Sequence, residues 1–317
     1  MLSALLLGGS LREGYAQYRQ NPQFLPYSSV GFGVGTSTYF GDLAGYSQPI
    51  RSLFTLPRWN VGLNYSRQFT PRLGARASFT WARITGDDYT FARSNPVKYA
   101  AQFVRNLHFR NDLKEFALIG TYDFIPGGRT PRDRPKLAPY ALLGVALLAH
   151  NPQALPSLAT VAGDNSSRNW QSLQPLNTEG QGQPGYPKPY SLITVSVPIG
   201  LGVRYALNES FNLAAEIRVT PSFSDYLDDV GGPYPPDVSG LSPLGVEFSN
   251  RSTEEIAART EQSRVDGINR ITGAGIDPTA IATRGGGGRI PLRDSYLLTS
   301  FQIQYIIPAK IKCPPIR

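Results

Sequence analysis

Eight segments of alternating apolar and polar residues, joined by connections of very unequal length, most constrain the fold of this chain. The segments cover residues 28–42, 59–69, 73–84, 107–124, 138–151, 193–206, 211–221 and 296–307. Residues 70–72 and 207–210 form tight turns, whereas the connections after the first, third, fifth and seventh segments are long. Outer-membrane barrels have an even number of antiparallel strands, short periplasmic turns and longer extracellular loops. The pattern predicts an all-β fold, an eight-stranded antiparallel transmembrane β-barrel.

The alternation assigns one face of each strand to lipid and the other to the lumen. Odd-numbered positions from Trp59 to Phe69 are apolar apart from Arg67, and the even-numbered positions between them are small or polar. Successive side chains of a strand point to opposite faces, so the odd positions are expected to meet lipid.

Three charges fall on the inward face of the third and seventh segments, namely Arg76, Glu216 and Arg218. The interior of an eight-stranded barrel is just wide enough for side chains to fill it. These charges are therefore expected to pair or hydrogen-bond inside a plug, because unpaired buried charges are strongly unfavourable. Bulk conduction of solutes, and with it a small-molecule substrate, is not expected.

The composition agrees with a barrel and argues against a helical membrane protein. The chain has 317 residues, of which 41% are hydrophobic, yet no apolar run approaches the roughly 20 residues that a membrane-spanning helix needs. Gly 32 and Tyr 17 fit glycine-kinked, aromatic-belted strands, although a soluble all-β protein could share them. The single cysteine, Cys313, excludes an internal disulfide and a metal site built on paired cysteines.

The start of the chain is typical of an export signal. A short apolar run is followed by Gly14-Tyr15-Ala16, a small-x-small pattern, which predicts a signal peptide over residues 1–16. Residues 17–27 are then an N-terminal periplasmic segment, residues 28–308 the barrel and residues 309–317 a periplasmic tail. The alternative is a disordered or helical N-terminus of a cytosolic protein.

This orientation places a basic stretch at the periplasmic rim. Arg129, Arg132, Arg134 and Lys136 follow the fourth segment and are candidate contacts for a periplasmic partner. A solvated turn is the simpler interpretation, since charge runs usually lie on surfaces. The net charge of +8 is dispersed and no recognised binding motif accompanies it, so nucleic acid is not an expected partner.

The last long loop, residues 222–295, has an organisation of its own. Its segment Ser252-Thr253-Glu254-Glu255 has the form of a capping box and predicts a polar helix near residues 252–264. The glycine-rich run 284–289 beyond it is expected to be a flexible connector.

Motifs for catalysis or cofactor binding yield little. His108 and His150 are the only histidines, and neither belongs to a metal-ligand spacing or accompanies a nucleophile-elbow motif. Neither a cofactor nor a metal is expected. Because some small outer-membrane barrels modify lipids with a rim histidine and a serine, a lipid-modifying barrel enzyme stays an alternative.

Four short segments resemble a known family. They are TYFGDL at residues 38–43, RNLHFRND at 105–112, NTEGQG at 177–182 and FSDYLDDV at 223–230. In this order and spacing they are similar to the PorG family, the outer-membrane β-barrel component of the type IX secretion system of Bacteroidota. The resemblance implies a non-enzymatic outer-membrane subunit needed for protein secretion and gliding motility. It also implies association with the periplasmic ring built from a lipoprotein and its partner, besides contact with membrane lipid.

The four segments also supply candidate residues for partner contacts or loop stabilisation. They are Arg105, Asn106, Arg110, Asn111, Asp112, Glu179, Gly180, Gln181, Gly182, Asp225, Tyr226, Asp228 and Asp229. Close carboxylates repel unless compensated, so the last three acids are expected to pair with arginines such as Arg105 or Arg110 rather than to bind a cation.

For the other segments a structural role is the simpler expectation. Residues 105–112 are expected to anchor the rim in lipid headgroups, and the glycines of 179–182 to shape a turn. A passive barrel of the OmpA type is the remaining alternative for the whole chain.

Overall fold

The computed structural model describes residues 24–44, 49–158, 168–281, 283–285 and 293–308. The expected signal peptide, most of the segment after it and the tail at 309–317 lie outside the described residues. No helix in the described ranges is long and apolar enough to cross a membrane.

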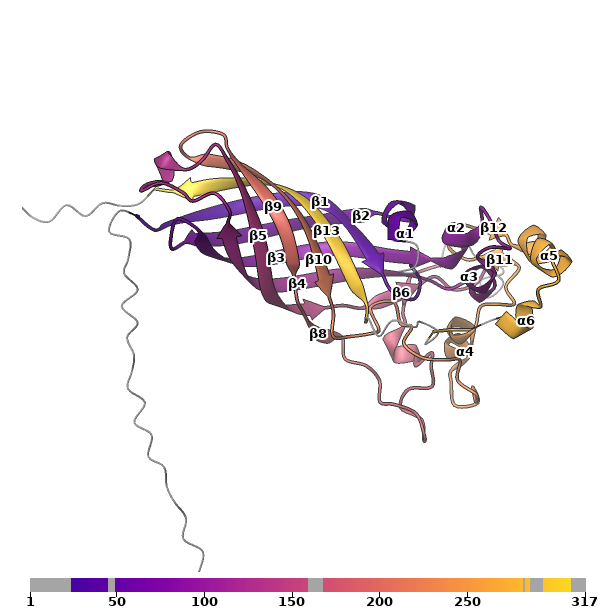
Figure 1. Ribbon diagram of the computed structural model, residues 1–317. Helices are drawn as coiled ribbons and strands as arrows, with labels where there is room; N and C mark the ends of the chain where they lie inside the picture. Colours follow the sequence, from indigo (N-terminus) through magenta and orange to yellow (C-terminus); the bar gives the residue numbers. More distant parts are fainter. Residues whose placement is uncertain (1–23, 45–48, 159–167, 282, 286–292, 309–317) are drawn as a thin grey trace, which may run out of the picture.

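Eight antiparallel strands form a closed barrel, which confirms the predicted fold class (Figure 1). They are β1 (Tyr27–Phe40), β2 (Arg58–Gln68), β3 (Leu73–Asp87), β4 (His108–Asp123), β5 (Leu137–Ala149), a broken strand made of β8 (Ile193–Ser196) and β9 (Ile199–Ala206), β10 (Phe211–Pro221) and β13 (Ser295–Ile307). The barrel closes where β1 pairs with β13, from Ser28 opposite Ile307 to Phe40 opposite Ser295. The sixth strand is interrupted at Pro198, which has no N–H to donate, and both of its halves pair with β5.

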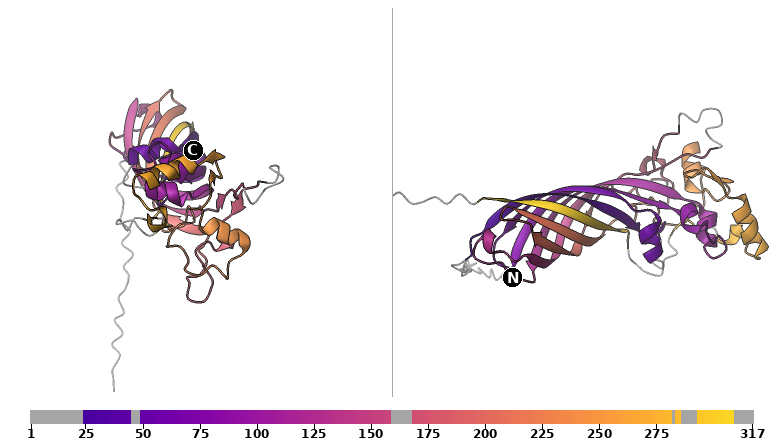
Figure 2. Two further views of the ribbon diagram at one scale, coloured as in Figure 1. Left: turned by 90° about the vertical axis from the view of Figure 1, so that its right-hand side faces the viewer. Right: turned by 90° about the horizontal axis from the view of Figure 1, so that it is seen from above.

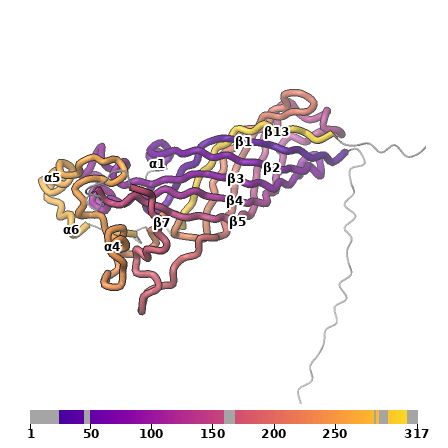
Figure 3. Tube along the Cα trace, turned by 180° about the vertical axis from the view of Figure 1, so that it is seen from behind, coloured from indigo at the N-terminus to yellow at the C-terminus, as the bar shows by residue number. Residues whose placement is uncertain are grey.

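The two rims of the barrel differ. Tight turns close one end, here called the turn rim, and the first and last strands also end there (Figures 1 and 3). At the other end, the loop rim, β3 and β4 continue past their neighbours. Their extension pairs through Arg110 and Gln153 with β6 (Pro152–Ala154), which pairs with β7 (Gln171–Ser172).

The described parts of loops 41–57, 88–107, 150–192 and 222–294 fold together beyond the loop rim, and we call them the loop cap (Figure 2). Its elements are α1 (Pro49–Thr55), α2 (Asp88–Ala92), α3 (Ala100–Arg105), η3 (Gln174–Leu176), α4 (Pro243–Ser249), β11 (Ile256–Ala257), β12 (Gln262–Ser263), α5 (Val265–Gly273) and α6 (Pro278–Ile281). One further 3-10 turn, η1 (Pro131–Asp133), lies at the turn rim.

The helix expected near residues 252–264 is wrong, because the chain there makes a turn and the β11–β12 hairpin. The Glu254 carboxylate does not cap a helix; it accepts hydrogen bonds from Arg251 Nε (2.7 Å) and Asn106 Nδ2 (3.1 Å). The Arg264 backbone N–H donates to the Glu255 carbonyl at 2.7 Å and closes the hairpin. Tertiary partners thus outweigh the local capping signal.

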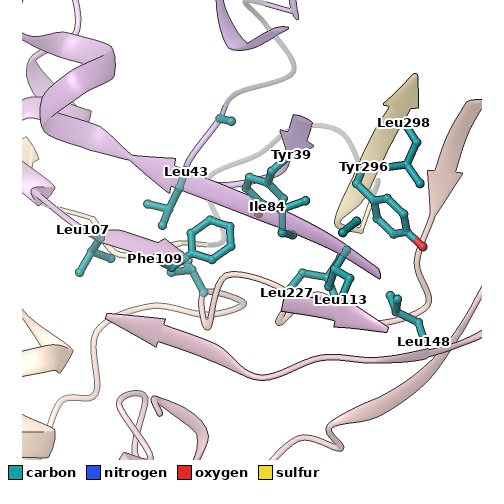
Figure 4. Close-up of a cluster of buried hydrophobic side chains, with 13 residues drawn as sticks. Tyr39, Leu43, Ile84, Leu107, Phe109, Leu113, Leu148, Leu227, Tyr296 and Leu298 are labelled. Carbon is teal, nitrogen blue, oxygen red and sulfur yellow. The ribbon is translucent and has the colours of Figure 1, made fainter. Parts of the chain in front are cut away.

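Apolar cores lie at the loop rim and inside the cap, and a smaller apolar cluster lies on the inner faces of β4 and β5. Figure 4 shows the cluster at the loop rim, where side chains of strands and loops meet, among them Tyr39, Phe109 and Leu227. A second cluster joins α2, α3 and α5 through Tyr89, Phe103 and Ile271. The loop cap is therefore a folded part of the molecule with its own core.

The outer wall carries an apolar belt. Large exposed side chains come from strands around the wall, among them Leu63, Phe79, Leu118, Leu143, Leu201 and Phe301. On the loop side of this belt Trp59 and Trp81 pack edge to face, with ring centroids 5.1 Å apart. Tyr122 and Tyr205 mark the turn side. An apolar band between two aromatic girdles is the lipid-facing surface of a transmembrane barrel.

Replacing Leu63 by arginine is expected to destabilise the barrel. Leu63 is 59% exposed in the middle of the belt, and an arginine near the bilayer midplane costs about 2–4 kcal/mol. The free energy of unfolding by urea, measured after reconstitution in lipid vesicles, tests this. Val265→Arg in the loop cap is the control, since Val265 is exposed to water. Equal effects of the two substitutions would contradict the membrane assignment.

Candidate functional site

Ion pairs cross the lumen of the barrel. Arg76 on β3 makes a two-pronged pair with Glu216 on β10, and Arg218 on β10 binds Glu115 on β4 at 2.7 Å. Since other strands separate β10 from both β3 and β4 in the wall, both pairs cross the lumen. The hydroxyl of Tyr140 donates to Glu216.

A third pair, Arg204 with Asp123 at 3.1 Å, lies nearer the turn rim. The three charges expected inside the barrel therefore lie there, but Glu115, which pairs with Arg218, and the whole Arg204–Asp123 pair were missed; the two missed acids lie on β4. The alternation of β4 gives the signal that could have found them, because both occupy odd positions whose neighbours are outward-facing. Filled in this way, the lumen is a plug of paired charges.

Removing the Glu216 carboxylate is expected to destabilise the barrel by about 3–5 kcal/mol, since Arg76 would be left buried and unpaired. Glu216→Ala and its control Glu209→Ala can be compared by urea unfolding in vesicles. Glu209 pairs with Arg132 at the exposed turn rim, where such a pair contributes at most about 1 kcal/mol. A Glu216 variant as stable as the Glu209 variant would mean that the lumen pair is dispensable.

At the loop rim, Arg284 is the centre of a polar cluster. Its side chain is 2% exposed and donates to Glu179 (3.1 Å), Asp229 (3.0 Å) and the Ser249 carbonyl (2.6 Å). Asp229 thus pairs with an arginine, as predicted, but that arginine is Arg284 and not Arg105 or Arg110. Burial raises the pKa of Asp229 to about 6, against the opposing attraction of Arg284.

Arg105 serves a different acid. It binds both oxygens of Asp88 at 2.8 Å and donates to the carbonyls of Asp42 (2.7 Å) and Arg284 (2.6 Å). The guanidinium is buried, so the expected anchoring in headgroups is wrong for this residue. Burial raises the pKa of Asp88 even though Arg105 opposes the shift.

The other residues of 105–112 divide between the cap and the outer wall. Asn106 has a left-handed backbone (φ 58°) at the end of α3, and Asn111 Nδ2 donates to the Leu227 carbonyl at 2.7 Å. Arg110 lies 4.2 Å from the Trp170 ring centroid, while Asp112 pairs with Arg83 at 2.6 Å on the outer wall.

The segment 179–182 shapes its own loop. Gly180 and Gly182 have φ values of +80° and +84°, a region that favours glycine. Gln181 Oε1 accepts from the Glu179 N–H at 3.0 Å, and the Glu179 carboxylate accepts from the N–H groups of Gly231 and Gly232 at 3.0 and 3.1 Å. These contacts hold Glu179 against the loop that follows β10.

Two aromatic contacts continue this network. Tyr226 stacks on Tyr190 with ring centroids 4.6 Å apart, and Tyr190 donates to Asp229 at 2.7 Å. Asp225 is half-buried beside them, and its burial raises the pKa of its carboxyl. Within the described ranges, no group of three or more His, Cys, Asp and Glu side chains is arranged to hold a metal ion.

One hydroxyl lies between two buried acids at the loop rim. The Tyr39 hydroxyl is 2.7 Å from Asp228 Oδ2 and 2.5 Å from Asp294 Oδ1. A phenol has one hydrogen to donate, so the second contact requires a proton on one of the two carboxyls. Burial, reinforced for Asp228 by the Asp294 charge, raises the pKa of both acids well above the ordinary value.

The loop cap is expected to lose stability as pH rises. A carboxyl whose pKa is raised in the folded state binds more protons there than in the unfolded state, so stability falls with pH above about 4. Asp228→Asn supplies the needed hydrogen permanently and should flatten this dependence. Protection of the cap from protease at pH 5 and pH 8 measures it, with Asp237→Asn on the surface as control. An Asn variant as unstable as Asp228→Ala would contradict the shared proton.

The two histidines are buried in the loop cap. His108 Nε2 accepts from the Leu155 N–H at 3.0 Å, and the His108 ring packs edge to face on Trp170. His150 stacks on Tyr190, and burial lowers its pKa to about 4. Both rings thus pack against aromatic side chains of the cap, His108 edge to face and His150 stacked.

The turn rim carries the basic stretch. Arg134 is half-buried and ties two turns together, donating to the Glu209 carbonyl (3.0 Å) and to Asn212 Oδ1 (2.8 Å). Arg132 pairs with Glu209 in water. Arg129 and Lys136 are exposed and make no ion pair with any described residue. Three cations of this stretch thus remain accessible at the rim, and the fourth is structural.

No family model matches the chain, and no curated protein matches it. Among solved structures, the attachment invasion locus protein Ail of Yersinia pestis is 11% identical with a TM-score of 0.36, over 89% of this chain and 99% of Ail. Neisserial surface protein A is 9% identical with a TM-score of 0.34, over 88% and 96% of the two chains.

The outer membrane protein OprG from Pseudomonas aeruginosa is 12% identical with a TM-score of 0.32, over 90% of this chain and 99% of OprG. The class of this protein follows from its own geometry: a closed eight-stranded wall, an apolar belt between aromatic girdles and a plugged lumen. It is an outer-membrane β-barrel protein.

Proposed function

We propose that this barrel is a non-enzymatic subunit of the type IX protein secretion system and associates with the periplasmic ring of that system. One observation carries the proposal: the four segments that resemble the PorG family, far apart in sequence, are bonded to one another at the loop rim. Tyr39 contacts Asp228, and Asn111 Nδ2 donates to the Leu227 carbonyl. Thr178 donates to Asp229 and thereby joins the remaining segment.

The mutual bonding of these segments gives a physical reason for the resemblance. Each of them supplies polar groups that would be buried without a partner if another were absent, and such groups cost about 1–3 kcal/mol each. A family that keeps this loop rim must keep all four together. The four resembling segments therefore belong to one three-dimensional feature, the bonded loop rim, and this common location supports the proposal.

The sealed lumen agrees with a scaffold rather than a conduit. Charges such as Arg76 and Glu216 fill the interior, so partners would meet the barrel at its rims. In this proposal the turn rim, where β1 begins and β13 ends, faces the periplasm and the loop cap faces the exterior. The exposed cations Arg129, Arg132 and Lys136 would then meet the ring lipoprotein or its partner.

A passive barrel of the OmpA type has the same wall, so only dependence of secretion on the chain separates it from the proposed subunit. For a lipid-modifying enzyme, burial of both histidine rings is an unfavourable arrangement, because a catalytic base must reach its substrate. We therefore favour the secretion subunit.

Charge reversal at the turn rim should reduce secretion without loss of the barrel. The triple variant Arg129→Glu, Arg132→Glu, Lys136→Glu removes the cations that would attract the ring, and secreted cargo is expected to fall about ten-fold or more. Culture-supernatant protein, compared with a gene deletion strain and with the amount of barrel in the outer membrane, measures the effect.

The matched control reverses three exposed cations of the loop cap, Lys98→Glu, Lys188→Glu and Arg270→Glu. A photocrosslinker at Arg132 should capture the ring proteins, and one at Val265 should not. Normal secretion in the deletion strain would reject the proposed function, and crosslinks confined to Val265 would reject the docking rim.

A further inference from the structure

Helix α1 presents two large apolar side chains that no described part of the chain covers. Ile50 and Phe54 are each 74% exposed. They lie one turn apart and hence on the same side of the helix. Ser52, between them in sequence, faces the opposite way and is buried. The helix therefore sits on the protein by its polar side and points its apolar side outward.

Arg51 holds α1 in this orientation. Its guanidinium lies 4.9 Å from the Phe91 ring centroid and 4.7 Å from that of Tyr99, on the segment that contains α2 and α3. Nη2 of Arg51 also donates to Ser94 Oγ at 2.9 Å and to the Phe91 carbonyl. Stacking between two rings together with hydrogen bonds fixes the position of a guanidinium, so the exposure of Ile50 and Phe54 is built into the fold.

The exposed pair continues the lipid-facing belt. α1 lies beside the loop-side ends of β1 and β2 (Figures 1 and 3), and the chain runs from α1 directly into β2. The first outward residue of β2 is Trp59, which packs on Trp81 in the loop-side girdle. Tryptophan marks the boundary between hydrocarbon and headgroups. Ile50 and Phe54 thus lie at the edge of a surface that is already in lipid.

Charges around the girdle suit a lipid headgroup. Lys114 lies opposite Trp81 in the β3–β4 register, is exposed, and makes no ion pair with any described residue. Next to it Arg83 is paired with Asp112. A lysine at this level reaches the phosphate layer while its stem covers apolar surface.

We propose that α1 is an interfacial helix whose Ile50 and Phe54 side chains insert into the membrane at the loop-side interface. A protein partner is the poorer occupant, because a helix of 7 residues offers much less than the roughly 800 Å² per partner of a stable protein interface. Lipid needs no such area, since the belt already holds the barrel at that depth. The inference rests on the membrane barrel alone and not on a role in secretion.

Fluorescence quenching by brominated lipid tests whether α1 inserts into the membrane. In a Cys313→Ser background, Phe54→Cys is labelled with bimane and the protein is reconstituted in phosphatidylcholine–phosphatidylglycerol vesicles whose acyl chains carry bromine. Two reference positions are labelled in the same way: Leu63→Cys in the belt and Val265→Cys in the loop cap. Heat-modifiable gel mobility verifies that each variant is folded.

Quenching by brominated lipid at position 54 is expected to be about two-fold or more above that at position 265 and to approach that at position 63, because an inserted apolar side chain contacts acyl chains. Iodide in the water should quench the label at 265 and spare the label at 54. If position 54 behaves like position 265 toward both quenchers, α1 lies in water and the proposal is overturned. The same comparison at Ile50→Cys repeats the test on the second side chain.

Discussion

The pairing of β1 with β13 is the constraint on which the rest of the structure depends. Inside a bilayer no water is available to satisfy backbone N–H and C=O groups, so a sheet can cross only if it has no open edge. In the strand pair that closes the wall, Tyr39 lies opposite Tyr296, so the first strand of the barrel is bonded to the last. Everything between them, including the long loops, is therefore tied into one closed cylinder. The loop after β10 must return to the loop rim before β13 can begin, which places Asp294 beside Asp228.

Closure also fixes what the interior can do. Eight strands leave a lumen that side chains fill, and here ion pairs share it with a small apolar cluster on the inner faces of β4 and β5. Arg76 and Arg218 each find a carboxylate on another strand, so the pairs cross the lumen. Buried pairs of this kind add little net stability compared with apolar residues, but removing one partner is costly. The lumen therefore favours one arrangement of the strands, and contacts with other molecules are left to the rims and the outer wall.

The strands could be predicted from the sequence because their signal is local. Alternation with period two and tight turns identify each of the eight wall strands from its own residues, whereas the break at Pro198 and the added strands β6 and β7 were not predicted. The inward charges followed from the same rule. The loop cap depends instead on partners distant in sequence, such as Arg284 for Glu179 and Arg105 for Asp88. No periodic pattern encodes such pairs. The capping-box signal at Ser252 therefore predicted a helix, whereas tertiary contacts stabilise a hairpin in the structure.

Buried arginines explain how loops so rich in polar residues can pack. Arg264 donates to the carbonyls of Phe103 (2.7 Å) and Val104 (3.0 Å) in the last turn of α3. Arg284 does the same for Ser249, the last residue of α4. Helices of 6 and 7 residues are unstable alone, and the carbonyls at their C-terminal ends have no partner within the helix.

A guanidinium can satisfy several such carbonyls at once, and its positive charge suits the negative end of the helix dipole. Arg264 stays protonated, although burial lowers its pKa to about 10. Part of the net charge of +8 is thus internal and serves folding of the cap. Among the residues that the structure describes, the largest fully buried side chains are the arginines Arg251, Arg264 and Arg284, so part of the basic composition belongs to the interior rather than to the surface.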